Sequence, residues 1–230
     1  MRASVGSECS VSVAHMVKPG ARHVQGRIRI IGGTWRGRLI DIPDGTAVRP
    51  TPDRVRETVF NWLSAVVEGA LCLDLFAGTG VLGFEALSRG AAEAWLVEQD
   101  AKLVDALRAT AQQFGATPRI VRRDVLAFLR EPPAARFEIV FLDPPYAAPL
   151  EPLLGVLIPW LAPRALVYVE RPRAAGLPAV PSAQWVKQSH AGAVEYGLLR
   201  FEEATMPGPS TSEAHSKRKS VQCIPARSTR

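Results

Sequence analysis

Two short stretches of the sequence hold residues whose types and spacing suit chemistry on a bound ligand. Residues 71–83, LCLDLFAGTGVLG, begin as an apolar run, break into a glycine-rich turn and continue with a helical pattern. Residues 143–146, DPPY, follow directly on the apolar run EIVFL. We interpret the first stretch as the cradle of a cofactor and the second as the place where an amine is held for reaction.

The glycine-rich turn suits close contact with a ligand. Gly78 and Gly80 let the backbone bend tightly and approach a ligand where a Cβ would collide. The unpaired N–H groups at the start of the next helix then face that ligand. Residues 78–83 also match the G-x-G-x-x-G pattern of dinucleotide-binding proteins, with Glu98 lying 20 residues after Gly78. Spacing alone therefore does not separate a nicotinamide or flavin cofactor from S-adenosylmethionine.

Asp74 favours S-adenosylmethionine. It lies at the carboxyl end of the apolar strand, four residues before the first glycine. A dianionic pyrophosphate would be repelled there, whereas the methionyl part of S-adenosylmethionine carries an ammonium and a sulfonium. The structural alternative is an ordinary strand, turn and helix with a hydrogen-bonded aspartate.

The DPPY stretch brings hydrogen-bond acceptors next to an aromatic ring. Pro145 has no N–H and keeps the segment extended, which frees the carbonyl of Pro144. Asp143 adds carboxylate acceptors, and Tyr146 adds a flat surface. This set suits the exocyclic amine of a base, whose lone pair must be directed toward a methyl donor. The structural alternative is a proline-rich strand end with an unrelated tyrosine.

The elements around these stretches alternate between strand and helix. A strand at residues 94–98 ends in Glu98, which in a βαβ unit lies beside the ribose of the cofactor and accepts its hydroxyl protons. A strand at residues 119–122 leads to Asp124, near the expected adenine amino group. Asp124 precedes a short helical run and is equally suited to cap it. Strands at residues 165–170, 184–189 and 194–201 complete the expected sheet, the last two as an antiparallel hairpin.

Residues 27–42, RIRIIGGTWRGRLIDI, predict a basic β-hairpin with its turn at Gly32-Gly33. Its polar positions are cationic and surround a tryptophan, Trp35. Arginine binds phosphate with two hydrogen bonds and stacks on bases, so the hairpin is a candidate RNA-binding ribbon. An edge hairpin that uses its charges against aggregation is the alternative, and the charge distribution favours nucleic acid. The hairpin arginines are Arg27, Arg29, Arg36 and Arg38.

The segment after the hairpin changes from extended to helical. Thr51 suits a helix N-cap and Pro52 the first helical position. Apolar residues then recur at helical spacing and predict one buried stripe. Three arginines fall outside the stripe, where a surface helix would tolerate them or RNA would contact them; they are Arg49, Arg54 and Arg56.

Composition places the basic charge at the two ends of the chain. The 230 residues are 47% hydrophobic, enough for one sizeable α/β domain, with a net charge of +6. Residues 1–60 carry a net charge of +5, residues 61–204 of −3 and residues 205–230 of +4. Three distant cysteines indicate neither a disulfide framework nor a metal site, and no run reaches the ~18 apolar residues of a membrane span. We expect a soluble, cytoplasmic protein without a metal.

Four segments are expected along the chain. Residues 1–26 predict a disordered leader, within which Met16 is an alternative start. Residues 27–50 form the basic hairpin extension and residues 51–204 the catalytic domain. Residues 205–230, rich in Ser, Pro, Lys and Arg, predict a disordered basic tail.

With these motifs in view, residues 27–203 resemble bacterial 16S ribosomal RNA guanine-N2 methyltransferases of the small, single-domain type. The likeness lies in RIIGG at 29–33, WRGR at 35–38, RPTPDRVRETVFNWL at 49–63, DLFAGTG at 74–80, VEQD at 97–100 and DPPY at 143–146. DPPY and a glycine turn occur in many amino-methyltransferases. The segment at 49–63 is much more specific to this family.

The resemblance implies a Rossmann-like class I S-adenosylmethionine-dependent methyltransferase fold, with a mostly parallel seven-stranded sheet, a C-terminal antiparallel hairpin and an N-terminal hairpin. It places Asp143, Pro144 and Tyr146 at the target guanine. It implies cofactor contacts from Asp74, Phe76, Ala77, Gly78, Gly80, Glu98, Gln99, Asp124 and Val125. It suggests that the segment Arg49–Glu57 helps to frame the methionyl end of the cofactor and the RNA entry. We therefore expect RNA contacts from Arg49, Thr51, Arg54 and Arg56 of this segment, beside Arg27, Arg36 and Arg38 of the hairpin. The expected partner of this monomer is 16S rRNA in the 30S subunit or an assembly intermediate, with no membrane.

Three alternatives remain at this stage. A DNA adenine-N6 methyltransferase would use DPPY equally well. A non-catalytic RNA-binding module would keep the cofactor fold without turnover. A nicotinamide oxidoreductase fits least, because of Asp74 and because no acid suits the hydride site.

Overall fold

The computed structural model describes residues 24–46, 48, 51–145, 150–180 and 183–201. The expected tail at residues 205–230 lies outside these residues, as does the expected leader except for its last three residues. Arg49 and Tyr146, two of the expected site residues, also lie outside the described residues.

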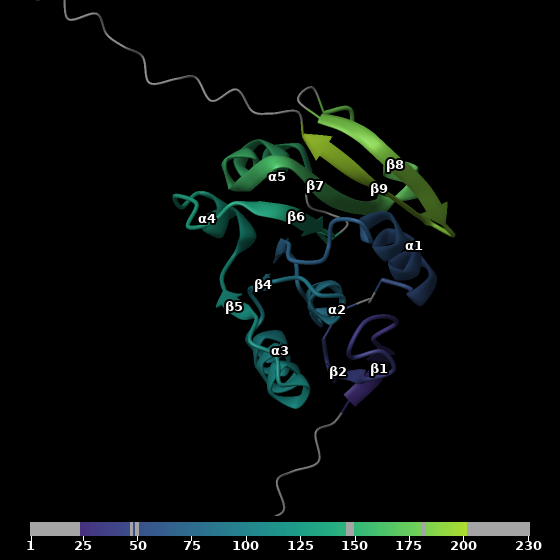
Figure 1. Ribbon diagram of the computed structural model, residues 1–230, viewed down its shortest axis with the longest axis vertical. Helices are drawn as coiled ribbons and strands as arrows, with labels where there is room; N and C mark the ends of the chain where they lie inside the picture. The colour runs from purple at the N-terminus through teal and green to yellow at the C-terminus, as the bar shows by residue number, and fades with distance from the viewer. Residues whose placement is uncertain (1–23, 47, 49–50, 146–149, 181–182, 202–230) are drawn as a thin grey trace, which may run out of the picture.

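A seven-stranded sheet forms the centre of the domain, in the order β5-β4-β3-β6-β7-β9-β8 (Figure 1). Its strands are β3 (Leu71–Asp74), β4 (Glu93–Glu98), β5 (Arg119–Arg122), β6 (Phe137–Leu142), β7 (Leu161–Pro172), β8 (Ala183–Ala191) and β9 (Val194–Phe201). Strands β3 to β7 pair in parallel, whereas β9 is antiparallel to both β7 and β8. The expected class I fold, with its C-terminal antiparallel hairpin, is confirmed.

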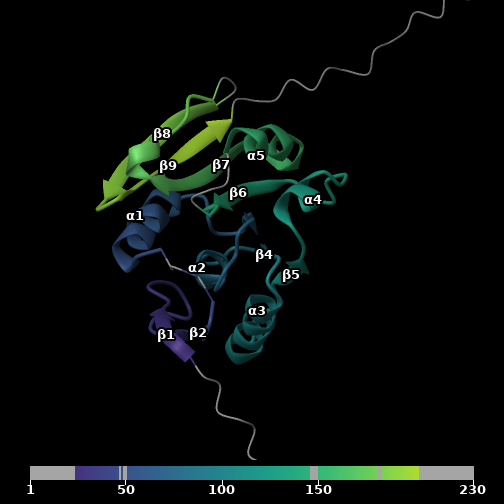
Figure 2. The same cartoon turned by 180° about the vertical axis from the view of Figure 1, so that it is seen from behind.

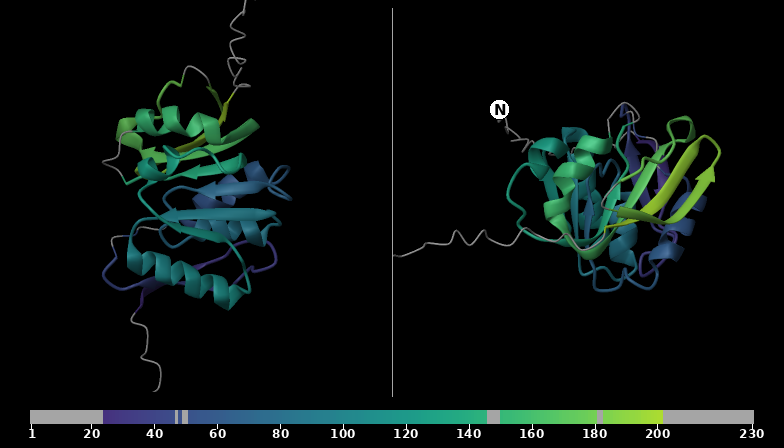
Figure 3. Two further views of the ribbon diagram at one scale, coloured as in Figure 1. Left: turned by 90° about the vertical axis from the view of Figure 1, so that its left-hand side faces the viewer. Right: turned by 90° about the horizontal axis from the view of Figure 1, so that it is seen from above.

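Helices cover both faces of this sheet (Figures 2 and 3). One face packs against α1 (Asp53–Leu63), α2 (Val81–Ser88) and α3 (Ala101–Phe114). The other face packs against α4 (Val125–Leu129) and α5 (Leu150–Leu157), which is followed by a 3-10 turn at Ile158–Trp160. A second 3-10 turn, Arg173–Ala175, follows β7. Because both faces are covered, the parallel strands are apolar on both sides, as their continuous hydrophobic runs predict.

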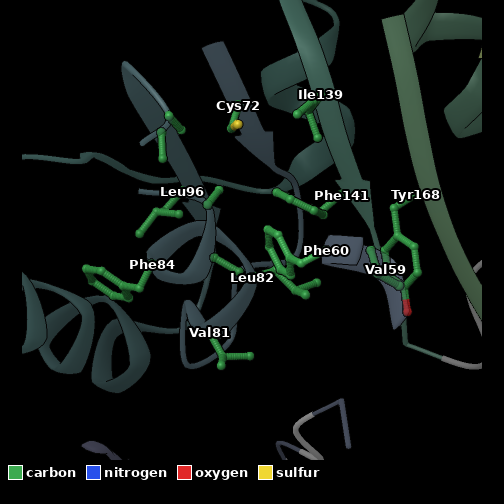
Figure 4. Close-up of a cluster of buried hydrophobic side chains, with 14 of the residues drawn as sticks. Val59, Phe60, Cys72, Val81, Leu82, Phe84, Leu96, Ile139, Phe141 and Tyr168 are labelled. Carbon is green, nitrogen blue, oxygen red and sulfur yellow. The ribbon is translucent and has the colours of Figure 1, made fainter. Parts of the chain in front are cut away.

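Aromatic and aliphatic side chains lock α1 and α2 onto the sheet (Figure 4). The sheet contributes buried side chains from four neighbouring strands, which are Cys72, Leu96, Ile139, Phe141 and Tyr168. They face Phe60 of α1 and Leu82 and Phe84 of α2, and the rings of Phe60 and Phe141 lie 5.8 Å apart. This packing fixes the carboxyl ends of β3, β6 and β7 relative to α1 and to α2, the helix that follows the glycine turn.

The N-terminal hairpin pairs β1 (Val24–Arg29) with β2 (Leu39–Pro43), and Arg29 lies opposite Leu39. The connection therefore spans residues 30–38, and the expected tight turn at Gly32-Gly33 is wrong. These glycines serve a different purpose, because the loop docks on the end of α2. Backbone N–H groups of Thr34 and Trp35 donate to the carbonyl and hydroxyl oxygens of Ser88 at 2.7 and 2.8 Å. A Cβ on Gly33, whose φ is +74°, would lie 1.8 Å from the Ser88 carbonyl oxygen.

The hairpin shares the core of the main domain. Its inner face carries four isoleucines that belong to the same hydrophobic cluster as α1, α2 and α3; they are Ile28, Ile30, Ile40 and Ile42. On the outer face, the Arg27 guanidinium donates to Asp41 across the two strands at 3.0 Å. The predicted leader also ends earlier than expected, since β1 begins at Val24.

Helix α1 begins one residue later than the sequence predicts. Its N-cap is Pro52, in an extended conformation and without a side-chain cap hydrogen bond, and its first residue is Asp53. Thr51 therefore does not cap the helix. Its side chain is buried instead, at the acidic end of the sheet described below.

Arg56 occupies the centre of a buried polar network. The guanidinium donates to the carbonyl of Thr51 at 3.2 Å, to the carbonyl of Arg29 at 3.0 Å and to the Asp53 carboxylate at 2.6 Å. Its Nη1 lies 3.5 Å from Glu85 Oε2, and both side chains have no exposed surface. The prediction that Arg56 contacts RNA is wrong, because a side chain that is fully enclosed by protein has no surface to offer.

Removing this guanidinium should destabilise the whole domain. Arg56→Ala leaves Glu85 buried without one of its cationic partners, so we expect a loss of about 3–5 kcal/mol in the free energy of unfolding. Arg54→Ala removes an exposed arginine from the same helix and should change that free energy by about 0.5 kcal/mol or less. Urea titrations of both variants measure the difference, and equal small losses would contradict a central role for Arg56.

Candidate functional site

A cavity of about 650 Å³ opens at the carboxyl ends of the parallel strands. This is the edge where open α/β sheets bind ligands, and the volume is in the range of cofactor sites. Eighteen residues line it: Gly45, Thr46, Val48, Leu75, Phe76, Gly78, Val97, Glu98, Gln99, Asp100, Leu103, Arg123, Asp124, Val125, Asp143, Pro144, Pro145 and Glu170. The glycine turn and the described part of the DPPY stretch thus meet in one cavity.

The glycine turn has the conformation that its sequence predicts. Gly78 and Gly80 have φ values of +53° and +77°, which favour glycine. A Cβ on Gly80 would lie 2.4 Å from Leu107 Cδ2, and one on Gly83 would lie 2.2 Å from Leu96 Cδ2. The second and third glycines therefore allow α2 to approach α3 and the sheet closely, while Gly78 lines the cavity.

Glu98 forms part of the cavity wall in a fixed orientation. Its Oε2 accepts the N–H of Gly78 at 2.8 Å, and its Oε1 accepts those of Gln99 and Asp100 at 2.8 and 2.9 Å. The carboxylate is therefore held at the end of β4, where it was expected beside a ribose. The N–H of Gly78, which a dinucleotide fold would offer to a phosphate, is already engaged by this acid.

Asp74 supports the turn from beneath. It is 3% exposed and does not line the cavity. Its carboxylate accepts the N–H of Gly83 at 3.2 Å and that of Phe76, while burial raises its pKa to about 7. Ala77 and Gly80, also expected at the cofactor, likewise contribute no cavity wall. The structure thus gives Asp74 a role in fixing the turn.

Asp124 is both a helix cap and a lining residue. Its side chain accepts the N–H of Ala127 at 2.9 Å as the N-cap of α4, and the residue faces the cavity beside Val125. The two interpretations left open by the sequence are therefore compatible. Phe76 and Gln99 also line the cavity, as expected.

The DPPY end of the cavity holds a second acid that the sequence did not single out. Glu170, near the end of β7, lies with Asp143 in the cavity wall and is 5% exposed. The buried hydroxyl of Tyr168 donates to Glu170 Oε2 at 2.6 Å. The Thr51 hydroxyl lies within hydrogen-bonding reach of both carboxyl groups. The feature of the sequence that could have identified Glu170 as a site residue is its position, because it is an acid that follows directly on an apolar run.

Burial affects the protonation of both carboxyl groups. It raises the pKa of Asp143 well above its usual range, and the nearby negative charge of Glu170 raises it further. Burial also raises the pKa of Glu170, whereas hydrogen bonds from Tyr168 and Thr51 oppose that change. Glu170 receives two hydrogen bonds that favour its ionised form, from Tyr168 and Thr51, whereas Asp143 receives one, from Thr51.

The cavity is strongly acidic. Five of its lining residues are carboxylic acids, namely Glu98, Asp100, Asp124, Asp143 and Glu170. Arg123 is the one basic residue among these eighteen lining residues, and it pairs with Glu131 at 2.6 Å. Such a cavity favours a cationic ligand and disfavours a dianionic pyrophosphate.

The expected RNA-binding arginines have different surroundings. Arg36 and Arg54 are exposed. Arg38 donates to the carbonyl of Phe114 at the end of α3 and lies over its ring, so part of its role is structural. Arg27 borders a hollow of about 340 Å³ between the hairpin and the start of α1. The hollow is lined by Arg27, Ile28, Arg29, Leu39, Thr51, Pro52 and Asp53.

The described part of the chain was compared with the requirements of a metal site and of a membrane-spanning helix. No group of three or more His, Cys, Asp or Glu side chains there is placed to hold a metal ion. None of the helices found among those residues is both long and apolar enough to cross a membrane.

Comparison with known proteins gives the family. The model of the family described as "Conserved hypothetical protein 95" matches residues 28–200. Ribosomal RNA small subunit methyltransferase D of Escherichia coli (strain K12) is 46% identical over 190 residues, covering 77% of this chain and 91% of that protein. The protein of the same name from Haemophilus influenzae is 38% identical over 194 residues, covering 80% of this chain and 100% of that protein.

The fold agrees with this relationship. A solved structure described as the putative methyltransferase yhhF from Escherichia coli aligns with a TM-score of 0.71 at 44% identity, over 77% of this chain and 99% of that chain. The putative methylase HI0767 from Haemophilus influenzae aligns with a TM-score of 0.67 at 37% identity, over 77% of this chain and 100% of that chain. The chain therefore belongs to the ribosomal RNA small subunit methyltransferase D family and is a methyltransferase.

Proposed function

We propose that this protein transfers a methyl group from S-adenosylmethionine to the exocyclic N2 amine of a guanine in 16S rRNA. The observation that carries the proposal is the acidic cavity, in which the glycine turn and Asp143-Pro144 lie together. The names of the curated relatives, which refer to small-subunit ribosomal RNA, support the class of substrate. The 30S subunit or an assembly intermediate is the proposed context.

The described residues fit S-adenosylmethionine better than a dinucleotide. The carboxylates of Glu98, Asp100 and Asp124 give this part of the wall a negative charge that suits the cationic methyl donor, and Glu98 is held where it can accept ribose hydroxyls. Val97, Leu103 and Val125 supply apolar walls for a heteroaromatic ring, with Asp124 close by for an amino group. The engaged N–H of Gly78 weakens the competing prediction of a nicotinamide cofactor.

The acceptor end of the cavity can orient an amine without a strong base. When bound, S-adenosylmethionine supplies an electrophilic methyl group that can be displaced in line. The carbonyl of Pro144 and the side chain of Asp143 accept hydrogen bonds from the amine, which directs its lone pair toward that methyl group. Asp143, whose pKa is raised, can accept through its carbonyl oxygen even when protonated. The amine loses one proton after transfer.

The basic hairpin is the proposed route for RNA to this end of the cavity. The hollow between the hairpin and α1 includes Thr51, which also reaches Asp143. RNA bound along Arg27 would therefore lie close to the amine-binding groups. A target base must leave its stack to enter the cavity, which costs least in a loop.

The decisive experiment identifies the methylated nucleoside. The protein is incubated with radiolabelled S-adenosylmethionine and 30S particles from cells that lack this activity, and the RNA is digested. We expect N2-methylguanosine. In a parallel incubation with duplex DNA, label recovered as N6-methyl-2′-deoxyadenosine would replace the proposal with DNA methylation. RNA binding without label would indicate a non-catalytic module.

Asp143→Ala should separate catalysis from cofactor binding. It removes one fixed polar group at the amine, so methyl transfer should lose at least ~2 kcal/mol of transition-state stabilisation, while S-adenosylmethionine affinity stays unchanged. Asp105→Ala, which removes an exposed carboxylate of α3, is the matched control. Single-turnover rates and calorimetric titrations give the two quantities, and near wild-type turnover would remove Asp143 from the mechanism.

Arg36→Ala should weaken RNA binding without affecting the cofactor. Loss of one phosphate contact lowers the slope of log affinity against log salt concentration by about 1. Arg130→Ala removes an exposed arginine that follows α4, on the other face of the sheet, and should leave the slope unchanged. Filter-binding titrations over a range of salt concentrations test this, and identical slopes for the two variants would count against the hairpin as the RNA-binding surface.

A further inference from the structure

Asp143 and Glu170 form a side-by-side pair of acids that the mechanism above uses only in part. Strands β6 and β7 are parallel, and Leu142 pairs with Val169. Asp143 follows Leu142, and Glu170 follows Val169. The two acids therefore lie next to each other, and both line the same cavity. The amine needs the acceptors of Asp143 and Pro144, which leaves Glu170 without a function in the transfer itself.

The surroundings of Glu170 hold its carboxylate in one orientation. Tyr168, fully buried, donates to Oε2 at 2.6 Å, and the Thr51 side chain also lies within hydrogen-bonding reach. Two acids that are buried side by side disfavour one another's ionisation, so a purely structural role would be served better by an amide. Buried hydrogen bonds that offset this cost favour a function that needs a second acceptor here.

The Watson–Crick edge of guanine presents two neighbouring donors, N1–H and the N2 amine. Adenine presents its N6 amine beside N1, which is an acceptor. A flipped base is identified through hydrogen bonds to this edge. Two adjacent acidic side chains therefore complement guanine, whereas an ionised carboxylate opposite N1 of adenine would face a lone pair.

We propose that Glu170 selects guanine by accepting its N1–H, while Asp143 and Pro144 hold the N2 amine. Glu170 is thus a specificity-determining residue, and Tyr168 and Thr51 position it. This inference rests on the proposed guanine-N2 activity. It adds to that activity a reason why a DPPY site, which suits several exocyclic amines, acts on guanine.

The wild-type enzyme provides the first test. Once the target nucleotide is mapped, 30S particles are reconstituted with 16S RNA that carries either guanosine or 2,6-diaminopurine riboside at that single position. The analogue keeps the 2-amine that takes the methyl group but has an acceptor at N1. We expect kcat/KM to fall roughly tenfold or more with the analogue, because a hydrogen bond to a charged group is lost. Equal values would overturn the proposal, whatever the variants do.

Glu170→Gln provides the second test. Tyr168 can still donate to the remaining oxygen, so the amide nitrogen is left to donate to N1 of the analogue. We expect guanosine methylation to fall. The ratio of kcat/KM for guanosine to kcat/KM for the analogue should decrease at least tenfold or fall below one. Glu151→Gln, which neutralises a largely exposed carboxylate, should keep the wild-type preference.

The results of these experiments distinguish failure of the proposed role of Glu170 from failure of the proposed guanine-N2 activity. Absence of N2-methylguanosine with the wild-type enzyme and guanosine particles contradicts the proposed function. Methylation with an unchanged preference in Glu170→Gln contradicts only the role of Glu170. S-adenosylmethionine affinity, measured by calorimetry, shows that the variant is folded, since Glu170 is assigned to the base and not to the cofactor.

Discussion

The buried ion pair of Arg56 and Glu85 joins the parts of the structure that the site depends on. Arg56 donates to the backbone of β1 and of the segment before α1, while Glu85 Oε2 accepts the N–H of Ile31. Glu85 Oε1 also accepts from Arg89 at 2.8 Å. One carboxylate and one guanidinium thus connect the hairpin, α1 and α2. Because Thr51 lies in the connected segment, the same pair sets the position of a residue at the acidic end of the cavity.

The site itself is organised around carboxylates, each with its own set of donors. Glu98 is oriented by three backbone N–H groups, and Asp74 by two. Glu170 is oriented by Tyr168 and Thr51. Such donors lower the cost of placing negative charge in a partly enclosed site, which would otherwise be prohibitive. The result is an electrostatic environment suited to cations and to base N–H groups.

Local rules were enough to predict many of these features from the sequence. The positive φ values of Gly78 and Gly80 and the N-cap at Asp124 each follow from a few neighbouring residues. The mostly parallel seven-stranded sheet and its C-terminal antiparallel hairpin followed from the alternation of strands and helices together with the family resemblance.

Features that depend on distant partners were not predicted correctly. Arg56 falls on the polar side of α1 by periodicity, yet the hairpin and α2 enclose that side. The sequence of Gly32 and Gly33 is typical of a hairpin turn, but their contact with Ser88 of α2 depends on the tertiary structure. Glu170 gains its significance only when β7 lies next to β6. Its own sequence context, VYVERP, gives no sign of Asp143.

The isoleucine face of the hairpin has a consequence for engineering. Since Ile28 and Ile40 lie in the domain core, the hairpin cannot be exchanged as a separate RNA-binding module without opening that core. Under the proposed function, changes of target would have to be introduced on its outer face, at positions such as Arg27 and the exposed Leu39. The positions proposed to contact RNA and those that support the core would then lie on opposite faces of the same two strands.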